Sequence, residues 1–108
     1  MTISMRHQKG TTIADVVGHI DLGSSPVLRK TLLDSLNESD RLALNLAAVK
    51  YIDSSGIASM LEVLKEARRT QKKFVLFGLT AAVREVLQLT RLTGVFEIHD
   101  SEQEVVDA

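Results

Sequence analysis

The segment from Tyr51 to Arg69, YIDSSGIASMLEVLKEARR, passes from an apolar run through Asp-Ser-Ser-Gly directly into an amphipathic helix. Apolar side chains recur along it with a period of about 3.6 residues, which places them on one helix face. The residues expected to face the core are Ile57, Met60, Leu61 and Leu64, and the periodicity leaves Val63 ambiguous. The segment therefore predicts a strand that ends near Asp53 and a helix that begins beside it.

Predicted strands and helices alternate along the rest of the chain. Apolar residues alternate over 3–7 and resume at Ile13 and Val17 beyond the turn KGTT, which predicts a hairpin. Ser24 or Ser25 can cap a following helix that has Pro26 in its first turn. The apolar face expected for this helix consists of Val27, Leu28, Leu32, Leu33 and Leu36.

The later segments continue the alternation. A strand over 42–52 leads into the Asp-Ser-Ser-Gly segment, and FVLFG predicts a short buried strand after the second helix. Thr80 is expected to cap a third helix, which ends before Gly94. The residues that this helix is expected to bury are Val83, Val86, Leu87 and Thr90. A last short strand and an acidic tail, frayed or helical, follow.

This order of elements predicts an α/β fold in a single domain that spans residues 1–108. Two strands followed by strand and helix alternation favour a mixed sheet whose parallel crossovers are helices packed on its face. A chain of 108 residues can bury about two thirds of its unfolded surface in one core and is too short for two ordinary domains.

The composition excludes several classes of partner. Thirteen Lys and Arg residues against fourteen Asp and Glu residues leave a net charge of -1, so no global field attracts nucleic acid or an anionic membrane. The absence of cysteine excludes disulfides and thiolate metal sites. No apolar run approaches the roughly 18 residues of a membrane span. We therefore expect a cytoplasmic protein with no nucleic-acid partner and no direct membrane insertion.

The Asp-Ser-Ser-Gly segment has a purely structural interpretation. Asp53 or Ser54 caps the free amides of the helix, Ser55 fills the first turn and Gly56 lets the backbone turn sharply. Catalytic interpretations fail because the segment lacks both the Gly-x-Ser-x-Gly pattern of serine hydrolases and the lysine of a phosphate-binding loop. We therefore expect no catalytic residue, no metal, no cofactor and no enzymatic activity.

A modification site is the alternative to that structural interpretation. An exposed serine at a helix N-terminus can accept a phosphoryl group, which the helix dipole and free amides would stabilise without disturbing the fold. The phosphoryl group would add about -1.5 to -2 charges to a nearly neutral domain. That charge is enough to disrupt a docked partner, so the serine would act as a switch.

Three stretches together resemble the STAS domain of anti-sigma-factor antagonists over almost the entire chain. They are GHIDLGSSPVLRKTL, LALNLAAVKYIDSSGIASMLEVLKEARR and FVLFGLTAAVREVLQLTRLTGVFEI. The Asp-Ser-Ser-Gly motif that enters a helix is the most specific part. The resemblance implies the STAS fold, a mixed sheet of four to five strands with three to four helices mainly on one face.

The resemblance also implies a function in partner switching. The unphosphorylated form would bind a histidine-kinase-like anti-sigma factor, a serine kinase, and so release the sigma factor. The kinase would phosphorylate Ser54, supported by Asp53, Ser55 and Gly56, and a PP2C-type phosphatase would reverse this. The expected docking surface combines the family resemblance with helix periodicity and consists of Asp21, Ser24, Ser25, Ala58, Ser59 and Glu62.

Two other functions of STAS domains are weighed against partner switching. One is the small subunit of a phospholipid-transport ABC complex, which braces the transporter ATPase and often lacks the serine that can be phosphorylated. The other is a scaffold of the stressosome or chemotaxis type, which usually carries an additional sensory domain. Retention of both Ser54 and Ser55 favours partner switching.

Overall fold

The strands lie in the sheet in the same order as in the chain. The computed structural model describes residues 1–107. Its elements are β1 (Thr2–Gln8), β2 (Thr11–Ile20), α1 (Ser25–Glu38), β3 (Arg41–Ile52), α2 (Ser54–Arg69), β4 (Lys73–Phe77), α3 (Ala81–Leu89), β5 (Glu97–His99) and α4 (Glu102–Val106). The sheet order is β1-β2-β3-β4-β5, in which β1 is antiparallel to β2 and the other pairs are parallel. The predicted α/β fold with a mixed sheet is confirmed.

The antiparallel pair is a tight hairpin. Gln8 faces Thr11 across a two-residue loop in which Lys9 and Gly10 have φ values of 50° and 79°. Two successive residues with positive φ form a type I′ turn, whose twist matches that of the strands it joins. The turn predicted from KGTT is therefore shorter than its four residues, and the strands on both sides are longer.

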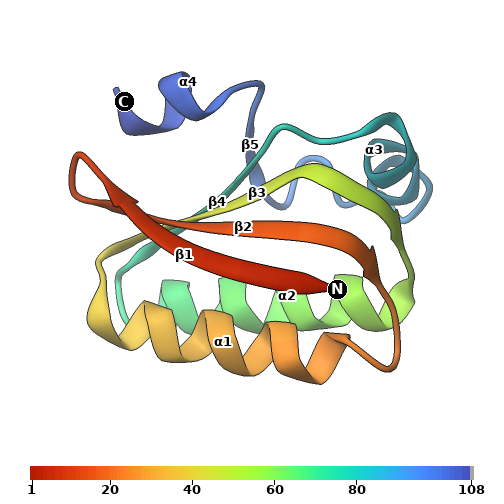
Figure 1. Cartoon of the computed structure of the whole chain (residues 1–108), viewed down its shortest axis with the longest axis horizontal. Helices are drawn as coiled ribbons and strands as arrows, with labels where there is room; N and C mark the ends of the chain where they lie inside the picture. The colour runs from red at the N-terminus through yellow and green to blue at the C-terminus, as the bar shows by residue number, and fades with distance from the viewer. Residues whose placement is uncertain (108) are drawn as a thin grey trace.

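The two long helices cover one face of the sheet. Figure 1 shows α1 and α2 side by side beneath the strands, with α3 at the end of the molecule where β3 finishes. Their apolar faces meet the downward side chains of β2, β3 and β4 in one core. Its fully buried members include Leu28, Leu32, Leu44, Leu46, Met60, Val63, Leu76, Val83 and Leu87. Val63, which the periodicity left ambiguous, thus belongs to the core.

The opposite face carries a smaller core beneath α4. Val105 is 1% exposed and packs with Ile13, Ala43, Val75 and Phe77. Figure 1 shows α4 on the side of the sheet away from α1 and α2. The acidic tail of the sequence is therefore helical. Its Val105 side chain covers the face of the sheet opposite α1 and α2, so helices pack on both faces.

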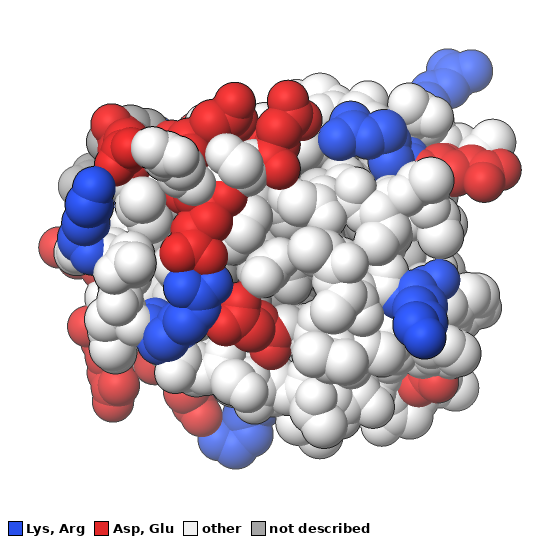
Figure 2. Space-filling model, turned by 45° about the horizontal axis from the view of Figure 1, so that its top comes forward, with Lys and Arg blue, Asp and Glu red and all other residues white. Residues whose placement is uncertain are grey.

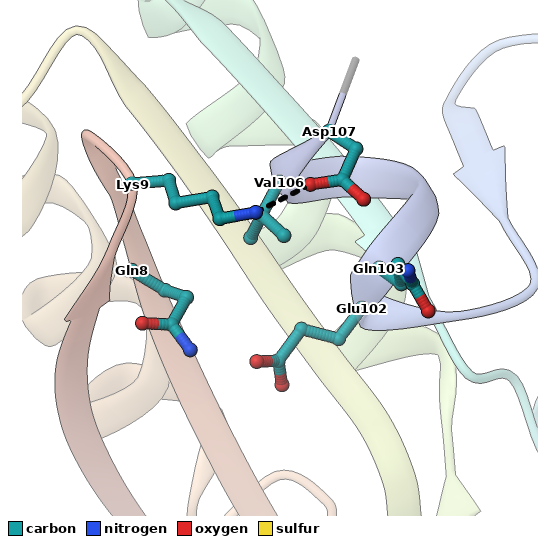
Figure 3. A pocket seen from close by; sticks show the side chains of 6 residues that line it. All are labelled: Gln8, Lys9, Glu102, Gln103, Val106 and Asp107. Atoms are coloured by element: carbon teal, nitrogen blue, oxygen red, sulfur yellow. Dashed lines mark hydrogen bonds and ion pairs between the residues drawn. The ribbon is translucent and has the colours of Figure 1, made fainter.

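Ion pairs hold α4 against the hairpin. Arg6 on β1 pairs with Asp15 at 2.6 Å and with Glu102, and Lys9 in the turn pairs with Asp107 at 2.8 Å. The Arg6 guanidinium lowers the pKa of both of its carboxyl partners. Figure 2 turns the α4 side of the molecule toward the viewer. Most of the charged side chains in this view gather on the left, and the middle of the view is largely uncharged. A cavity of about 350 Å³ separates the turn from α4, and in Figure 3 Lys9 reaches across it to Asp107.

Three side chains differ from the predicted burial pattern. Val17 is 51% exposed because it lies on the same face of β2 as Ile13 but outside the small core beneath α4, whereas Val16 is buried in the main core on the opposite face. Val27 is 56% exposed, so the apolar face of α1 begins at Leu28. Thr90 is exposed because it lies at the C-cap of α3, where its hydroxyl donates to the carbonyl of Val86.

The packing of α4 can be tested with two neighbouring valines. Replacement of Val105 with Ala removes two buried methyl groups, and we expect it to lower the free energy of unfolding by about 1.5–2 kcal/mol. Val106→Ala is the matched control, because Val106 is only half-buried against the same core, and its cost should be clearly smaller. Urea unfolding measures both. Equal costs would show that α4 does not bury Val105 as described.

Candidate functional site

The site begins where β3 ends and α2 starts, with one residue between them. Asp53 is the N-cap of α2, and its Oδ1 accepts the amides of Ser55 at 2.9 Å and Gly56 at 3.2 Å. The Ser55 hydroxyl donates to the same oxygen. Of the two predicted caps, Asp53 is therefore the one that the structure uses.

These hydrogen bonds hold Asp53 in its charged form. The Ser55 hydroxyl, followed by the amides of Gly56, Ser55 and Leu22, lowers the pKa of the Asp53 carboxyl because each donor stabilises the carboxylate. Leu22 belongs to the loop between β2 and α1, so one carboxylate binds groups from two segments. The Asp53 amide adds a second link, since it donates to the carbonyl of Ile20 at 3.1 Å.

Gly56 is required by space. A Cβ atom at this position would lie 2.6 Å from Cγ2 of Ile20 and 2.7 Å from Cγ1 of Ile52. Both isoleucines are buried at the ends of neighbouring strands. The sequence prediction gave Gly56 the role of a sharp turn, but the residue lies inside the first turn of α2 and its function is close packing.

The loop between β2 and α1 is fixed by its own polar groups. The Asp21 Oδ1 accepts the amides of Gly23 and Ser24, each at 3.1 Å. The Ser24 hydroxyl accepts the Asp21 amide at 2.9 Å and lies 3.1 Å from the Asp21 carboxylate. Ser24 occupies the N-cap position of α1, as predicted, but its hydroxyl turns back to the loop and does not cap the helix.

Ser54 is the free hydroxyl of the motif. Its side chain is exposed, and within residues 1–107 it makes no hydrogen bond, whereas the neighbouring Ser55 is half-buried and bonded to Asp53. The two serines of the motif therefore differ in chemistry. Ser55 holds the junction together, and Ser54 is available to a group from outside.

The structure changes one expectation about phosphate binding at this helix. The amides of Ser55 and Gly56 are already bonded to the Asp53 side chain, and the Ile57 amide donates to the Asp53 carbonyl. A phosphoryl group on Ser54 would therefore meet a carboxylate where the sequence predicted free amides. It would add negative charge beside existing negative charge and gain little from the helix N-terminus.

Two residues of the predicted docking surface are buried. Ser59 is 4% exposed, and its hydroxyl donates to the carbonyl of Ser25 at 3.2 Å. Ser25 is also 4% exposed, as the first residue of α1. The placement of both on the surface was wrong because α1 packs along this side of α2. Ala58 and Glu62 are exposed as predicted.

One exposed apolar residue escaped the sequence analysis. Leu22 is 76% exposed, and it belongs to the loop whose Leu22 amide helps to lower the pKa of Asp53, so this loop presents an apolar side chain to solvent. The sequence did carry a signal for this exposure, because Leu22 stands between Asp21 and Gly23, two residues that are typical of turns. Tyr51 is 49% exposed, with its ring 5.8 Å from that of His19.

Other chemistry finds little support in the described residues. Within 1–107, no group of three or more His, Asp or Glu side chains is arranged to hold a metal ion. Of the histidines, His7 lies against Thr12, His19 against Tyr51 and His99 against Glu97. In the same part of the chain, no helix has the length and apolar character needed to cross a membrane.

A mixed sheet with α1 and α2 on one face, and an exposed serine where the β3–α2 junction meets the β2–α1 loop, defines a domain of the STAS type. The family model of the STAS domain matches residues 2–105, and the chain belongs to this family. An anti-sigma-B factor antagonist of Listeria monocytogenes is 31% identical over 91 residues, which cover 83% of this chain and 80% of that protein.

Solved structures support the fold. The anti-sigma factor antagonist SpoIIAA in its unphosphorylated form has a TM-score of 0.81 and 18% identity, over 98% of this chain and 94% of that one. The phosphorylated form of SpoIIAA, described as a Bacillus cell fate determinant, has a TM-score of 0.74 and 17% identity, over 98% and 97%. These likenesses confirm the predicted STAS architecture.

The close approach at Gly56 predicts that alanine there is harmful. Helix propensity alone would make Gly56→Ala more stable by about 1 kcal/mol. The contacts at 2.6 and 2.7 Å outweigh that gain, because overpacking of a core costs about 1–3 kcal/mol. We expect a net loss of up to about 2 kcal/mol in urea unfolding.

Gly94→Ala is the matched control, because nothing lies within 4 Å of the added atom. Its effect should stay within about 0.5 kcal/mol. If Gly56→Ala were as stable as the control, the contact with the two isoleucines would be wrong.

The lowered pKa of Asp53 predicts a difference at acid pH. A carboxyl whose pKa is depressed in the folded state stabilises the protein at pH values above 3.8, the ordinary pKa of Asp. This stabilisation is lost as the pH falls through the folded-state pKa. Asp53→Asn keeps a capping side chain but does not titrate. We therefore expect the wild type to lose its advantage over Asp53→Asn as the pH is lowered below about 4. Melting temperatures across the pH range measure this, and a constant gap would contradict it.

Proposed function

We propose that this protein is an anti-sigma-factor antagonist that works by partner switching and is controlled at Ser54. The observation that carries the proposal is the free, exposed hydroxyl of Ser54 between two loops that are held rigid by Asp53 and Asp21. The family and the names of the relatives agree with this function. The protein would be a cytoplasmic regulator and a substrate, with no enzymatic activity of its own.

The unphosphorylated form binds a histidine-kinase-like anti-sigma factor. The contact surface that we assign consists of the β2–α1 loop, Ser54 and the exposed positions of α2. Leu22 supplies its apolar contact, and Ala58 leaves room for a close approach beside Ser54. Ser25 and Ser59 support this surface from below, through the hydrogen bond that joins α1 to α2.

Phosphorylation ends the complex by charge and volume. The kinase partner transfers a phosphoryl group to the Ser54 oxygen, and a PP2C-type phosphatase removes it. The phosphoryl group brings about -1.5 to -2 charges next to the Asp53 carboxylate. Because the amides of Ser55, Gly56 and Ile57 are already bonded to Asp53, this charge remains exposed to the partner. A partner surface that accommodates one carboxylate is repelled by the added charge.

Mass spectrometry of the protein from its native cells tests the switch. We expect an adduct of about 80 Da on the peptide that contains Ser54, and its amount should change between growing and stressed cultures. Ser54→Ala should abolish the adduct. Ser55→Ala is the matched control, because its hydroxyl is engaged by Asp53, and it should keep the adduct.

The same preparations show which partner is bound. We expect a histidine-kinase-like protein to co-purify with Ser54→Ala and to be lost from Ser54→Glu, with a drop in affinity of at least about tenfold. An adduct absent under every condition, together with a co-purifying transporter ATPase, would overturn the proposal in favour of a phospholipid-transport subunit.

A further inference from the structure

β1 has an outer edge that nothing covers. It is the first strand of the sheet and pairs only with β2. Figure 1 shows it in the foreground, with no other element of residues 1–107 along its outer side. Five of its seven residues are exposed, and they are Thr2, Ser4, Met5, His7 and Gln8. An uncovered edge of this kind presents a row of free backbone amides and carbonyls.

The hairpin turn determines which backbone groups are free. Gln8 and Thr11 close a type I′ turn, so they form a hydrogen-bonded pair. Hydrogen-bonded pairs alternate along an antiparallel ladder, so every second residue of β1 directs its amide and carbonyl toward β2. The groups directed away from β2 are those of Ile3, Met5 and His7.

β1 also lacks the usual protection against pairing. Edge strands are commonly short, bulged, or marked by proline or by charged side chains, especially lysine. β1 has seven residues in continuous register with β2, contains no proline, and carries only one charged side chain, Arg6. That charge is compensated by Asp15 and Glu102. The opposite edge, β5, has only three residues, which leaves little for a partner strand to pair with.

We propose that β1 is a self-association edge, which pairs antiparallel with β1 of a second copy and is centred on Met5. Met5 is the midpoint of the strand, and this centre places Met5 opposite Met5 of the second copy and Ile3 opposite His7 of the second copy. All the free backbone groups then meet in about six hydrogen bonds. Arg6 lies opposite Ser4 of the second copy, so no like charges face each other.

A second copy is favoured as the occupant because the edge is complementary to itself. A two-fold axis through Met5 satisfies the free amides and carbonyls of both strands with one register. The two sheets would become one continuous sheet. Ser54 lies beyond the carboxyl end of β3, so the axis would place the two Ser54 residues at opposite ends of the dimer. The inference is independent of the proposed function and leaves that surface free.

Single cysteines test the register directly, because the chain has none of its own. In the proposed pair, the Cα atoms of the two Met5 residues are about 5.5 Å apart, which suits a disulfide. The two Ser4 residues are offset by two positions along the strands and lie about 8 Å apart, which is too far. We expect Met5→Cys to form a disulfide-linked dimer at least about ten times faster than Ser4→Cys under mild oxidation. Equal rates, or no dimer from either variant, would overturn the proposal.

Sedimentation equilibrium tests the association without a cross-link. We expect the mass of the wild type to rise from one chain toward two with concentration. Met5→Pro removes an amide that β2 does not use, and edge strands tolerate proline, so it should remain folded and monomeric. Met5→Leu is the matched control and should associate like the wild type. A wild type that stays monomeric at every concentration, or a folded Met5→Pro that still dimerises, would refute the proposed pairing through β1.

Discussion

The Asp53 carboxylate is the interaction on which the site depends. It caps α2, accepts a hydrogen bond from the Ser55 hydroxyl, and has its pKa lowered in part by the amide of Leu22 in the loop between β2 and α1. Because β2 and β3 are parallel, the segments that follow them start from the same end of the sheet, where both strands finish. Without this shared anion, the two loops would be positioned only by packing and by the hydrogen bond from the Asp53 amide to the Ile20 carbonyl. Electrostatic interactions as well as steric packing therefore fix the position of the two loops relative to each other.

The same interaction determines what phosphorylation can do. Helix N-termini usually bind anions because their amides are unpaired. Here the chain supplies its own anion, the Asp53 carboxylate, which occupies the amides of Ser55 and Gly56. In the proposed switch, a phosphoryl group on Ser54 would have no comparable site to enter and would act outward, on the partner. The fold does not need to rearrange, because Gly56 and the isoleucines behind it lock the first turn of α2 in place.

Local patterns predicted much of this structure, and long-range packing explains the rest. The strand and helix periodicities were sufficient for the α/β fold, and the Asp-Ser-Ser-Gly motif located the junction. The sequence did not show that α1 covers Ser59, because a serine on a helix is compatible with either face until the neighbouring helix is placed. Val17 was misplaced because a period of two shows which face of a strand a residue occupies, but not how far the short helix α4 covers that face. The hydrogen bonds from the Ser55 and Gly56 amides to Asp53 could not be predicted, because the sequence alone allows either Asp53 or Ser54 to cap the helix.

The burial of Ser59 and Val63 also bears on the evolution of specificity. Ser59 is committed to the contact with α1 and Val63 to the core, so few positions of the proposed surface, notably Leu22, Ala58 and Glu62, remain free to vary without disturbing the core. A cell that contains several domains of this kind must insulate each pathway from the others. On the proposed docking surface the set of recognition residues is small, so a single substitution within it would redirect the signal while the fold remains the same.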